Sequence, residues 1–368
     1  MATTAAHPRS GPKLIIEPRL YTPRWLSPVV SVGAIVVALI LGGGVIAAVG
    51  GDPLAIYAHI ARAAFGNLGV FSDTLVIATP LILVGLACSL AFRMKLWNIG
   101  AEGQFYMGAL GASAVILAGW VPEGTPQPIA LGIMALAGIA AGAFWGLIPG
   151  LLKAKLKVSE IISTLMMNYI AIQLVNYFVF GVWSDSGFQM SKVFPKMAWL
   201  PKLGDYAKEV PLFRGLTTHF GLVFALIAVV IVWYILYRSR WGYEIRLIGD
   251  NPRAAEYAGI DIVKNSVLVL VTSGALAGLA GMSEISGVVH RLQGAISSGY
   301  GFTGIIIAWL AKLNPIVVIL VSVLFGGLIL AGREIQPAGV PRLIQGIILF
   351  MLIASDVLLR YRVRIARA

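Results

Sequence analysis

The chain has 368 residues, of which 58% are hydrophobic and only 12% are charged. A soluble globular protein carries about 25% charged residues, so this chain cannot cover a water-facing surface with polar side chains, and most of its solvent must be lipid. The formal net charge of +12 comes from short Lys and Arg clusters between apolar runs, a pattern that orients membrane helices and argues against a nucleic-acid partner.

The N-terminal segment is polar, proline-rich and basic, and an apolar run long enough to cross a bilayer follows it. We expect residues 1–28 to form a disordered cytoplasmic tail. The run 29–49 reads as a retained first transmembrane helix rather than a cleaved signal. The basic segment 359–368 is expected to be a second cytoplasmic tail, which leaves 29–358 as one transmembrane permease domain.

Ten apolar runs predict an all-α, polytopic integral membrane protein with about ten transmembrane helices. Membrane β-strands would instead show about ten residues of alternating polarity. The eighth run is short and is expected to be a broken or re-entrant element. The expected spans are 29–49, 74–92, 103–120, 129–151, 160–181, 217–237, 265–283, 300–312, 315–332 and 341–358.

The distribution of Lys and Arg predicts the orientation. Most of these residues fall in segments that lie on the cytoplasmic face if the chain starts inside, so both termini are expected in the cytoplasm of a bacterial inner membrane. The segment 182–216 is an exception, because it is expected outside and yet carries several lysines. Its prolines and tryptophans suggest a partly structured interfacial loop.

Polar residues interrupt the apolar background between the second and third spans. Asn98, Glu102 and Gln104 lie there among glycines that can bend the backbone. Irregular backbone persists in lipid only where it is buried in protein or lines water, so a hydrogen-bonded turn at a helix entry is the favoured interpretation. Direct contact with a transported solute is the alternative. Asn168 and Gln173 in the fifth span are further candidates for the translocation path, although a spacing of five need not put them on one helix face.

Glycines recur every fourth residue in the fourth span and again in the seventh. Such a stripe lets two helix backbones approach closely and gain van der Waals contact. We expect packing within this chain, and a subunit interface is the alternative. The glycines are Gly138, Gly142, Gly146 and Gly150, with Gly274 and Gly278.

The cytoplasmic segment between the sixth and seventh spans predicts a short capped helix. Asp250 or Asn251 suits the N-cap, Pro252 the first helical position and Gly259 the C-terminal stop. A short capped helix with small side chains is a shape that a groove on another protein can accept, and an ordinary amphipathic loop helix is the alternative. We expect a bulky residue at Ala255 or Gly259 to impair docking and to leave membrane insertion intact. The predicted docking residues are Gly249, Asp250, Asn251, Pro252, Arg253, Ala254, Ala255, Glu256 and Gly259.

The sequence indicates a protein that is not an enzyme. It has no G-x-x-x-x-G-K-[ST] loop for ATP phosphates, and its G-x-G-x-x-G at 299–304 enters an apolar span instead of following a strand. The single cysteine, Cys88, and scattered histidines predict no metal site. Few ionisable residues lie in the spans, namely Glu160, Glu284 and Asp356, which argues against an ion-coupled transporter, with Glu284 and Asp356 as the exceptions that stay open.

Two segments resemble a known family. W-N-I-G-A-E-G-Q at 97–104 and G-D-N-P-R-A-A-E-Y-A-G-I at 249–260 are similar to permeases of ATP-binding-cassette (ABC) importers for branched-chain amino acids, simple sugars and nucleosides. The resemblance covers most of 29–357 and includes G-Y-G-F-T-G-I-I-I-A at 299–308. The form I-G-A-E-G-Q is most similar to the nucleoside branch, whose binding proteins are lipoproteins of the basic-membrane-protein type. Trp97 departs from the Phe that the family often has.

The resemblance implies a division of labour. Two permease subunits, here a pair of different ones, form the path, and two separate ATPase subunits bind ATP and Mg²⁺, so this chain itself needs no cofactor. The segment Gly249 to Ile260 corresponds to the coupling helix that docks on the ATPase. An external binding protein, periplasmic or lipid-anchored, delivers the solute, and the loop 182–216 is a candidate for its docking surface.

Alternatives remain at this point. The same family imports simple sugars or branched-chain amino acids, so the solute is open. An ion-coupled secondary transporter and a membrane-embedded enzyme are interpretations from other classes. An ion gradient that drove uptake without ATP would favour the secondary transporter.

Overall fold

The computed structural model describes residues 13–19, 21, 23, 25–334 and 339–366. They belong to two compact units, one made by the two ends of the chain, Met1–Ala55 with Gly339–Ala368, and the other by Ile56–Ala338. The second unit, called here the helical unit, carries all the candidate site residues.

The expected all-α, multi-pass architecture is confirmed. Each predicted span coincides with a helix, and seven of these helices are long and apolar enough to cross a membrane. The ten helices are α1 (Leu26–Ala48), α3 (Leu68–Arg93), α4 (Ala101–Leu117), α5 (Gln127–Leu156), α6 (Glu160–Phe180), α7 (Gly221–Arg238), α10 (Ile262–Glu284), α11 (Tyr300–Leu310), α12 (Pro315–Ala331) and α13 (Val340–Arg360).

Three of the ten helices are short. Helices α4 and α12 have 17 residues each, and α11 has 11. Eleven residues make a helix of about 16 Å, roughly half of a bilayer core. The eighth expected span is therefore a half-length helix, preceded by a π-helical turn, η4 (Ile285–Val289), and by the non-helical segment 290–299.

Several elements had no counterpart in the sequence-based expectations. The two unexpected helices are α2 (Pro53–Phe65), which precedes α3, and α8 (Arg240–Asp250). Helix α8 is followed by α9 (Pro252–Tyr257), which is the short helix that the sequence predicts. The loop 182–216 contains three 3₁₀ turns, η1 (Lys196–Ala198), η2 (Leu203–Tyr206) and η3 (Pro211–Phe213), which agrees with its expected partial structure.

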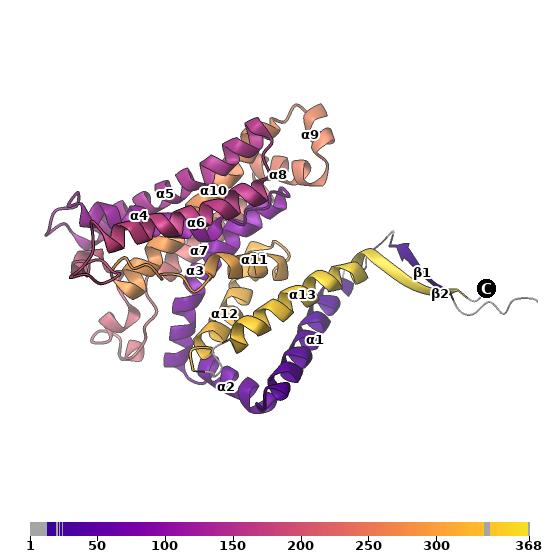
Figure 1. Ribbon diagram of the computed structural model, residues 1–368, viewed down its shortest axis with the longest axis horizontal. Helices are drawn as coiled ribbons and strands as arrows, with labels where there is room; N and C mark the ends of the chain where they lie inside the picture. Colours follow the sequence, from indigo (N-terminus) through magenta and orange to yellow (C-terminus); the bar gives the residue numbers. More distant parts are fainter. Residues whose placement is uncertain (1–12, 20, 22, 24, 335–338, 367–368) are drawn as a thin grey trace, which may run out of the picture. The chain divides into compact units, whose positions relative to one another are not determined.

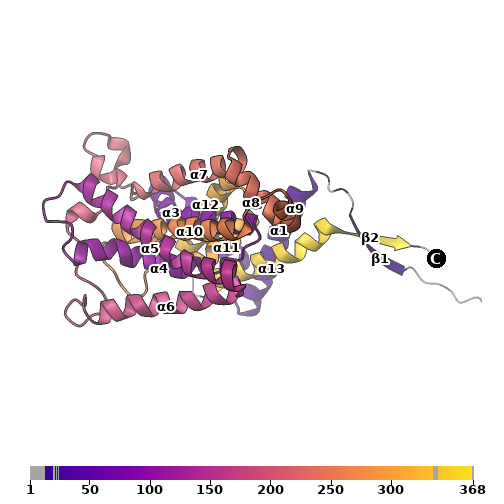
Figure 2. The same ribbon diagram turned by 90° about the horizontal axis from the view of Figure 1, so that it is seen from above.

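Helices α5 and α10 form the most extensive contact in the helical unit. A Cβ atom on Gly142 would collide with the carbonyl oxygen of Gly274, and one on Gly278 would collide with that of Gly138. The glycine stripe therefore packs within the chain, as expected. In Figure 2, α6 and α7 lie on opposite sides of the group that contains α4, α5 and α10.

The helical unit has two distinct ends. Helix α9 lies at one end, called here the α9 end, and the loop 182–216 lies at the other, called the loop end (Figure 1). Helix α10 starts near α9 and finishes with Glu284 at the loop end. Residues at the two ends of α10 therefore face opposite sides of the membrane.

The chain ends form a unit of α1, α13 and a two-stranded antiparallel sheet. Strand β1 (Lys13–Pro18) pairs with β2 (Tyr361–Ala366), with Glu17 opposite Arg362. The expectation of a disordered tail is thus wrong for residues 13–18, while residues 1–12 lie outside the described part of the chain. Ile in both strands and Val in β2 favour extended backbone, and each strand supplies the partner that the other lacks.

Candidate functional site

Helix α9 has the start and the stop that its sequence predicts. The backbone N–H of Ala254 donates to Oδ1 of Asn251 at 3.2 Å, which makes Asn251 the N-cap, and Pro252 takes the first position. Gly259 follows the helix with φ of +73°, a conformation that glycine adopts without steric cost. The predicted capped helix is therefore present.

Two predicted docking residues lie outside this helix. Gly249 and Asp250 are the last residues of α8, and Gly249 is buried. A Cβ atom on Gly249 would collide with the carbonyl oxygen of Arg93 at the end of α3. Gly249 therefore allows α8 to pack closely against α3. The predicted docking residues that remain are those after Asp250.

Ala255 and Tyr257 point in opposite directions from α9. Ala255 is 0% exposed, whereas Tyr257 is 95% exposed. A bulky residue at Ala255 would first disrupt the packing of α9 on its own unit, so the docking role of Ala255 stays a prediction. The exposed residues of this segment are Asn251, Pro252, Arg253, Glu256, Tyr257, Ala258 and Gly259.

Helix α8 is tied to the start of α10. Nε1 of Trp241 donates to Oδ1 of Asn265 at 2.8 Å, and Nδ2 of Asn265 donates to Glu244 at 3.1 Å. Ser239 caps α8 by accepting from the N–H of Gly242 at 3.0 Å. The first two bonds link α8 to the start of α10, the long helix that ends at Glu284.

Asn98 is the centre of a buried polar turn. It is 0% exposed, and its Nδ2 donates to Gln104 and to Oγ of Ser273, both at 2.9 Å. Its Oδ1 accepts from the N–H of Gly100 at 3.0 Å. Ser273 in turn donates to the carbonyl of Ala87 at 2.7 Å. The turn before α4 is thus fixed to α3 and α10.

Asn168 supports the same turn from α6. Its Oδ1 accepts from the N–H of Gly103 at 2.8 Å, and its Nδ2 donates to the carbonyl of Ile99 at 2.9 Å. The side-chain amide of Asn168 therefore bonds to two backbone groups of this irregular segment, which must find partners where no water is present. These hydrogen bonds support the helix-entry interpretation of Asn98 and Gln104, and Asn168, named as a candidate for the translocation path, bonds to the same turn.

Glu102 joins the entries of two short helices. It lies in the first turn of α4, and its Oε2 accepts from the backbone N–H of Gly301 in α11 at 2.6 Å. Gly301 has no room for a side chain, because a Cβ atom there would collide with the backbone of Glu102. The carboxyl therefore satisfies an N–H group at the start of α11 that no helical bond can reach.

Gln173 does not belong to this cluster. It is exposed on α6, where its side chain accepts from Nδ2 of Asn176 at 3.0 Å. The five candidates for the translocation path therefore separate into a buried group, Asn98, Glu102, Gln104 and Asn168, and a surface residue.

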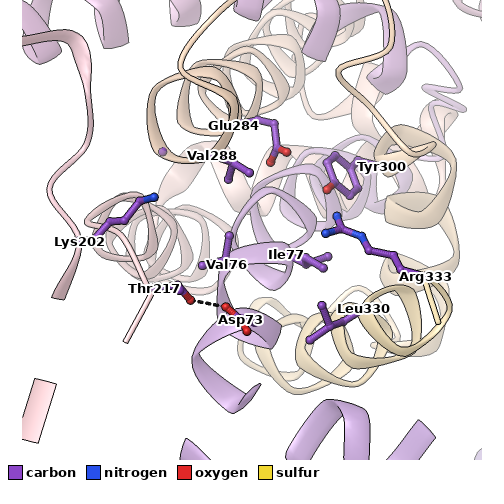
Figure 3. Close-up of a pocket in the computed structure, with 11 residues that line it drawn as sticks. Asp73, Val76, Ile77, Lys202, Thr217, Glu284, Val288, Tyr300, Leu330 and Arg333 are labelled. Carbon is purple, nitrogen blue, oxygen red and sulfur yellow. Dashed lines mark hydrogen bonds between the residues drawn. The ribbon is translucent and has the colours of Figure 1, made fainter. Parts of the chain in front are cut away.

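The loop end contains a cavity that the sequence did not predict. It measures about 350 Å³ and is lined by residues of α3, α10, η4, α11 and the end of α12, with Lys202 and Thr217 from the chain between α6 and α7 (Figure 3). Glu284 is an ionisable residue inside a predicted span, and this feature of the sequence is the one that indicates the cavity. Its companions Asp73, Lys202 and Arg333 come from distant parts of the chain and carry no such signal.

Two histidines lie beneath the loop. His219 is 2% exposed, and its Nδ1 accepts from the N–H of Gly221 at 3.1 Å. Burial, with help from nearby Lys202 and His290, lowers the pKa of His219 from 6.5 to about 4. The ring of His290 stacks on Trp199 with 3.9 Å between centroids. Both imidazoles therefore serve as neutral packing groups at neutral pH.

Comparison with known proteins gives consistent similarities. A family model described as the permease component of branched-chain amino acid transport systems matches residues 70–355. The chain is 35% identical to a glucose ABC transporter permease of Haloferax volcanii, over 96% of this chain and 94% of the relative. It is 35% identical to a guanosine ABC transporter permease of Bacillus subtilis, over 88% and 93% of the two chains. It is 31% identical to a nucleoside ABC transporter permease of Lactococcus lactis, over 84% of each.

Proposed function

The chain belongs to the family of permease components of branched-chain amino acid transport systems, and from that premise we propose that the solute it imports is a nucleoside. The chain is a multi-pass permease subunit of an ABC importer and has no catalytic role of its own. A separate ATPase subunit and a substrate-binding protein complete such an importer.

Two similarities support a nucleoside as the solute. The turn before α4 has the form I-G-A-E-G-Q, which resembles the nucleoside branch, and two of the similar permeases act on guanosine and nucleosides. The similarity to a glucose permease makes a simple sugar the second candidate. A hexose and a nucleoside share vicinal hydroxyl groups, so the two classes present related chemistry.

The single observation that carries the coupling role is the position of α9. The helix is capped, exposes Tyr257 and lies at the opposite end of the helical unit from the loop 182–216. We propose that α9 enters a groove on the ATPase, which holds ATP and Mg²⁺, and that closure of the ATPase displaces α8 and α10 as one piece.

We also propose how the chain is oriented in the membrane and which proteins bind to it. The α9 end and both termini face the cytoplasm of a bacterial inner membrane, and the loop end receives a lipid-anchored or periplasmic binding protein. Pairing of β1 with β2 supports this orientation, because it keeps the two termini on one side and so requires an even number of crossings. The second permease subunit is expected to be a different chain.

Solute identity is tested with the complete importer in proteoliposomes. ATP inside the vesicles should drive accumulation of labelled guanosine or another nucleoside supplied with the binding protein. Labelled glucose and leucine are the comparison solutes. Accumulation of glucose or leucine without that of any nucleoside would overturn the proposed solute, and uptake without ATPase would overturn the coupling role of α9.

A further inference from the structure

The outer face of α6 carries polar side chains at membrane depth. Tyr169 is 63% exposed near the middle of this 21-residue helix, and Tyr177 is 66% exposed nearer to its loop end. Gln173 lies exposed between them. At a spacing of four residues the three side chains follow one another along a single face, called here the α6 stripe. Their polar atoms therefore face away from the rest of the helical unit.

Lipid is an unsuitable neighbour for the α6 stripe. Gln173 lies seven residues before the end of α6 at Phe180, which is about 10 Å by the helical rise and so well inside a bilayer core of about 30 Å. Neither the hydroxyl of Tyr169 nor Nε2 of Gln173 forms a hydrogen bond within the described part of the chain. Tyrosine is typical of the membrane–water interface, and an amide donor without a partner is costly in hydrocarbon. The α6 stripe must therefore face protein or water.

Helix α7, on the opposite side of the group of α4, α5 and α10, has the outer face that lipid requires (Figure 2). Its residues 221–232 are all apolar, and Ile227 and Val230 among them are 52% and 64% exposed. Its tyrosines, Tyr234 and Tyr237, come only in the last turns, where an interfacial belt is expected. Helix α6 is no more buried than α7, and yet it has the lowest mean hydropathy of the seven helices that are long and apolar enough to cross a membrane. The two sides of the helical unit therefore meet different surroundings.

Asn176 fixes the amide of Gln173. Its Nδ2 donates to Oε1 of Gln173 at 3.0 Å, and a Cβ atom on Gly294 would lie 2.7 Å from its Oδ1, so Asn176 is packed against the segment 290–299. The amide nitrogen of Gln173 stays free to donate. No residue of α6 after Glu160 is charged. The α6 stripe thus offers two aromatic rings and one oriented amide, without any charge.

We propose that the α6 stripe is this subunit's wall of the translocation path, facing the second permease subunit, and that its three side chains contact the solute in transit. Tyr169 and Tyr177 contact the flat or apolar faces of the solute, and Gln173 donates to its polar edge. A nucleoside presents both features, because its planar base stacks on aromatic rings and carries hydrogen-bonding groups along its edge. A zwitterionic amino acid would need charged partners, which the stripe lacks. This inference rests on the proposed function for the solute and for the second subunit.

Thiol labelling tests whether the α6 stripe meets water. Native Cys88 is buried, so one introduced cysteine can be followed in this chain. In the complete importer in proteoliposomes, during ATP turnover, a water-soluble maleimide should label Gln173→Cys at least about tenfold faster than Ile227→Cys, because the reactive thiolate forms in water and not in hydrocarbon. Ile227 is the matched control, since it is also exposed and lies at a similar depth, six residues from the start of α7 at Gly221.

The maleimide adduct tests whether this water is the path. An adduct on Gln173→Cys should stop ATP-driven uptake of guanosine, because it occupies the space that the solute crosses. The same treatment of the Ile227→Cys importer should leave the uptake rate unchanged.

A smaller change tests the contact with the base. Tyr169→Ala should slow guanosine uptake at least about tenfold through loss of stacking, whereas Tyr169→Phe, which keeps the ring, should retain most of the rate. A purine offers a larger face than a pyrimidine, so Tyr169→Ala should slow guanosine more than uridine. A merely structural role of Tyr169 would slow both nucleosides alike. Ile227→Ala is the control, and its uptake rates should not change.

The outcomes separate this inference from the proposed function. Labelling of Gln173→Cys as slow as that of Ile227→Cys, or an adduct that leaves uptake unchanged, would overturn the path assignment even if guanosine is the imported solute. Uptake of glucose instead of guanosine would overturn the proposed solute, and a block of that uptake by the Gln173→Cys adduct would still support the path. Equal slowing of guanosine and uridine by Tyr169→Ala would overturn the contact with the base.

Discussion

At the residue scale, the buried polar side chains of Asn98, Glu284 and His219 differ in how their polar atoms are bonded. Asn98 bonds backbone and side chains on three sides, so it holds an irregular turn in place. Glu284 keeps an unused oxygen, and His219 keeps a neutral ring against Gly287. All three are buried, and Nε2 of His219 also lacks a hydrogen-bond partner among the described residues, but of the three only Glu284 lines a cavity, so only Glu284 suggests a ligand.

Acid should loosen the loop through His219. Its pKa is lowered from 6.5 to about 4, so between these values the unfolded chain takes up a proton that the folded chain does not. The free energy of unfolding should therefore fall as the pH drops from about 6.5 to about 4, by at most about 3 kcal/mol, and stay constant above that window. Thermal unfolding followed with a thiol-reactive dye at Cys88 measures this loss.

The variant His219→Asn separates this effect from other titrating groups. An asparagine amide can accept from the N–H of Gly221, but it does not titrate. Its stability should therefore decline less than that of the natural chain over the same pH range. Equal losses in the two proteins would show that His219 is not responsible.

Tyr257 is the residue on which to test docking. Its side chain is 95% exposed, so Tyr257→Ala should leave the fold intact. Loss of an aromatic anchor from an interface typically costs about 2 kcal/mol, so association with the ATPase should weaken by more than about tenfold. Co-purification and solute-stimulated ATP hydrolysis measure the effect. Tyr206→Ala at the loop end is the control, and equal behaviour of the two variants would argue against docking through α9.

At the scale of elements, the glycines of α4, α5 and α10 set how closely three helices meet. Gly108 and Gly138 both lie against Gly278, so backbone touches backbone where side chains would normally intervene. Without a hydrophobic driving force in lipid, such close contact supplies the van der Waals energy that holds helices together.

A branched side chain at this contact should disrupt the bundle. A Cβ atom on Gly278 would collide with backbone on α5, so Gly278→Val should destabilise the protein by about 1–3 kcal/mol or more. Gly132→Val in α5 is the control, since no atom lies within 4 Å of a Cβ there. The yield of monodisperse protein and its thermal midpoint are the measurements. An equal loss of yield and thermal midpoint in both variants would show that the lower helix propensity of valine, and not the contact between α10 and α5, causes the effect.

At the scale of the whole molecule, pairing of the two chain ends constrains the topology. Strands β1 and β2 pair the two ends of the chain, so the proposed topology has both ends on one side of the membrane and an even number of crossings between them. The half-length helix α11 with the segment 290–299 must then count as one crossing if the other nine helices each make one. The proposed orientation places this small sheet in the cytoplasm.

Cross-linking tests the pairing of the ends. Glu17 and Arg362 are opposite each other in the sheet, and opposed residues of antiparallel strands have Cα atoms about 4.5–5.5 Å apart, within disulfide range. Glu17→Cys with Arg362→Cys should therefore form a disulfide on oxidation, detected after cleavage at a protease site inserted in the loop 182–216. Glu17→Cys with Arg364→Cys, which is out of register, should not. Labelling of either thiol by an impermeant reagent from outside intact cells would contradict the cytoplasmic assignment.

Much of the element pattern could be predicted because its causes are local. Apolar run length decides where a helix crosses lipid, and the ten predicted spans match helices to within a few residues at most ends. The caps of α9 depend on Asn251, Pro252 and Gly259, which are neighbours in the chain. Pairing of the tails was missed because each strand needs a partner more than 340 residues away. The amphipathic pieces α2 and α8 were missed because hydropathy alone does not mark them.

The sequence by itself determined the membrane class, the helices, the capped helix α9 and the resemblance to ABC permeases. Only the tertiary structure decided that Ala255 faces inward while Tyr257 faces out, that Gln173 stands apart from Asn98, and that Glu284 and Arg333 line one cavity. The physical reason is the range of the forces involved. Hydrophobic run length and capping act over one helix, whereas burial and the convergence of charges depend on how separate helices pack.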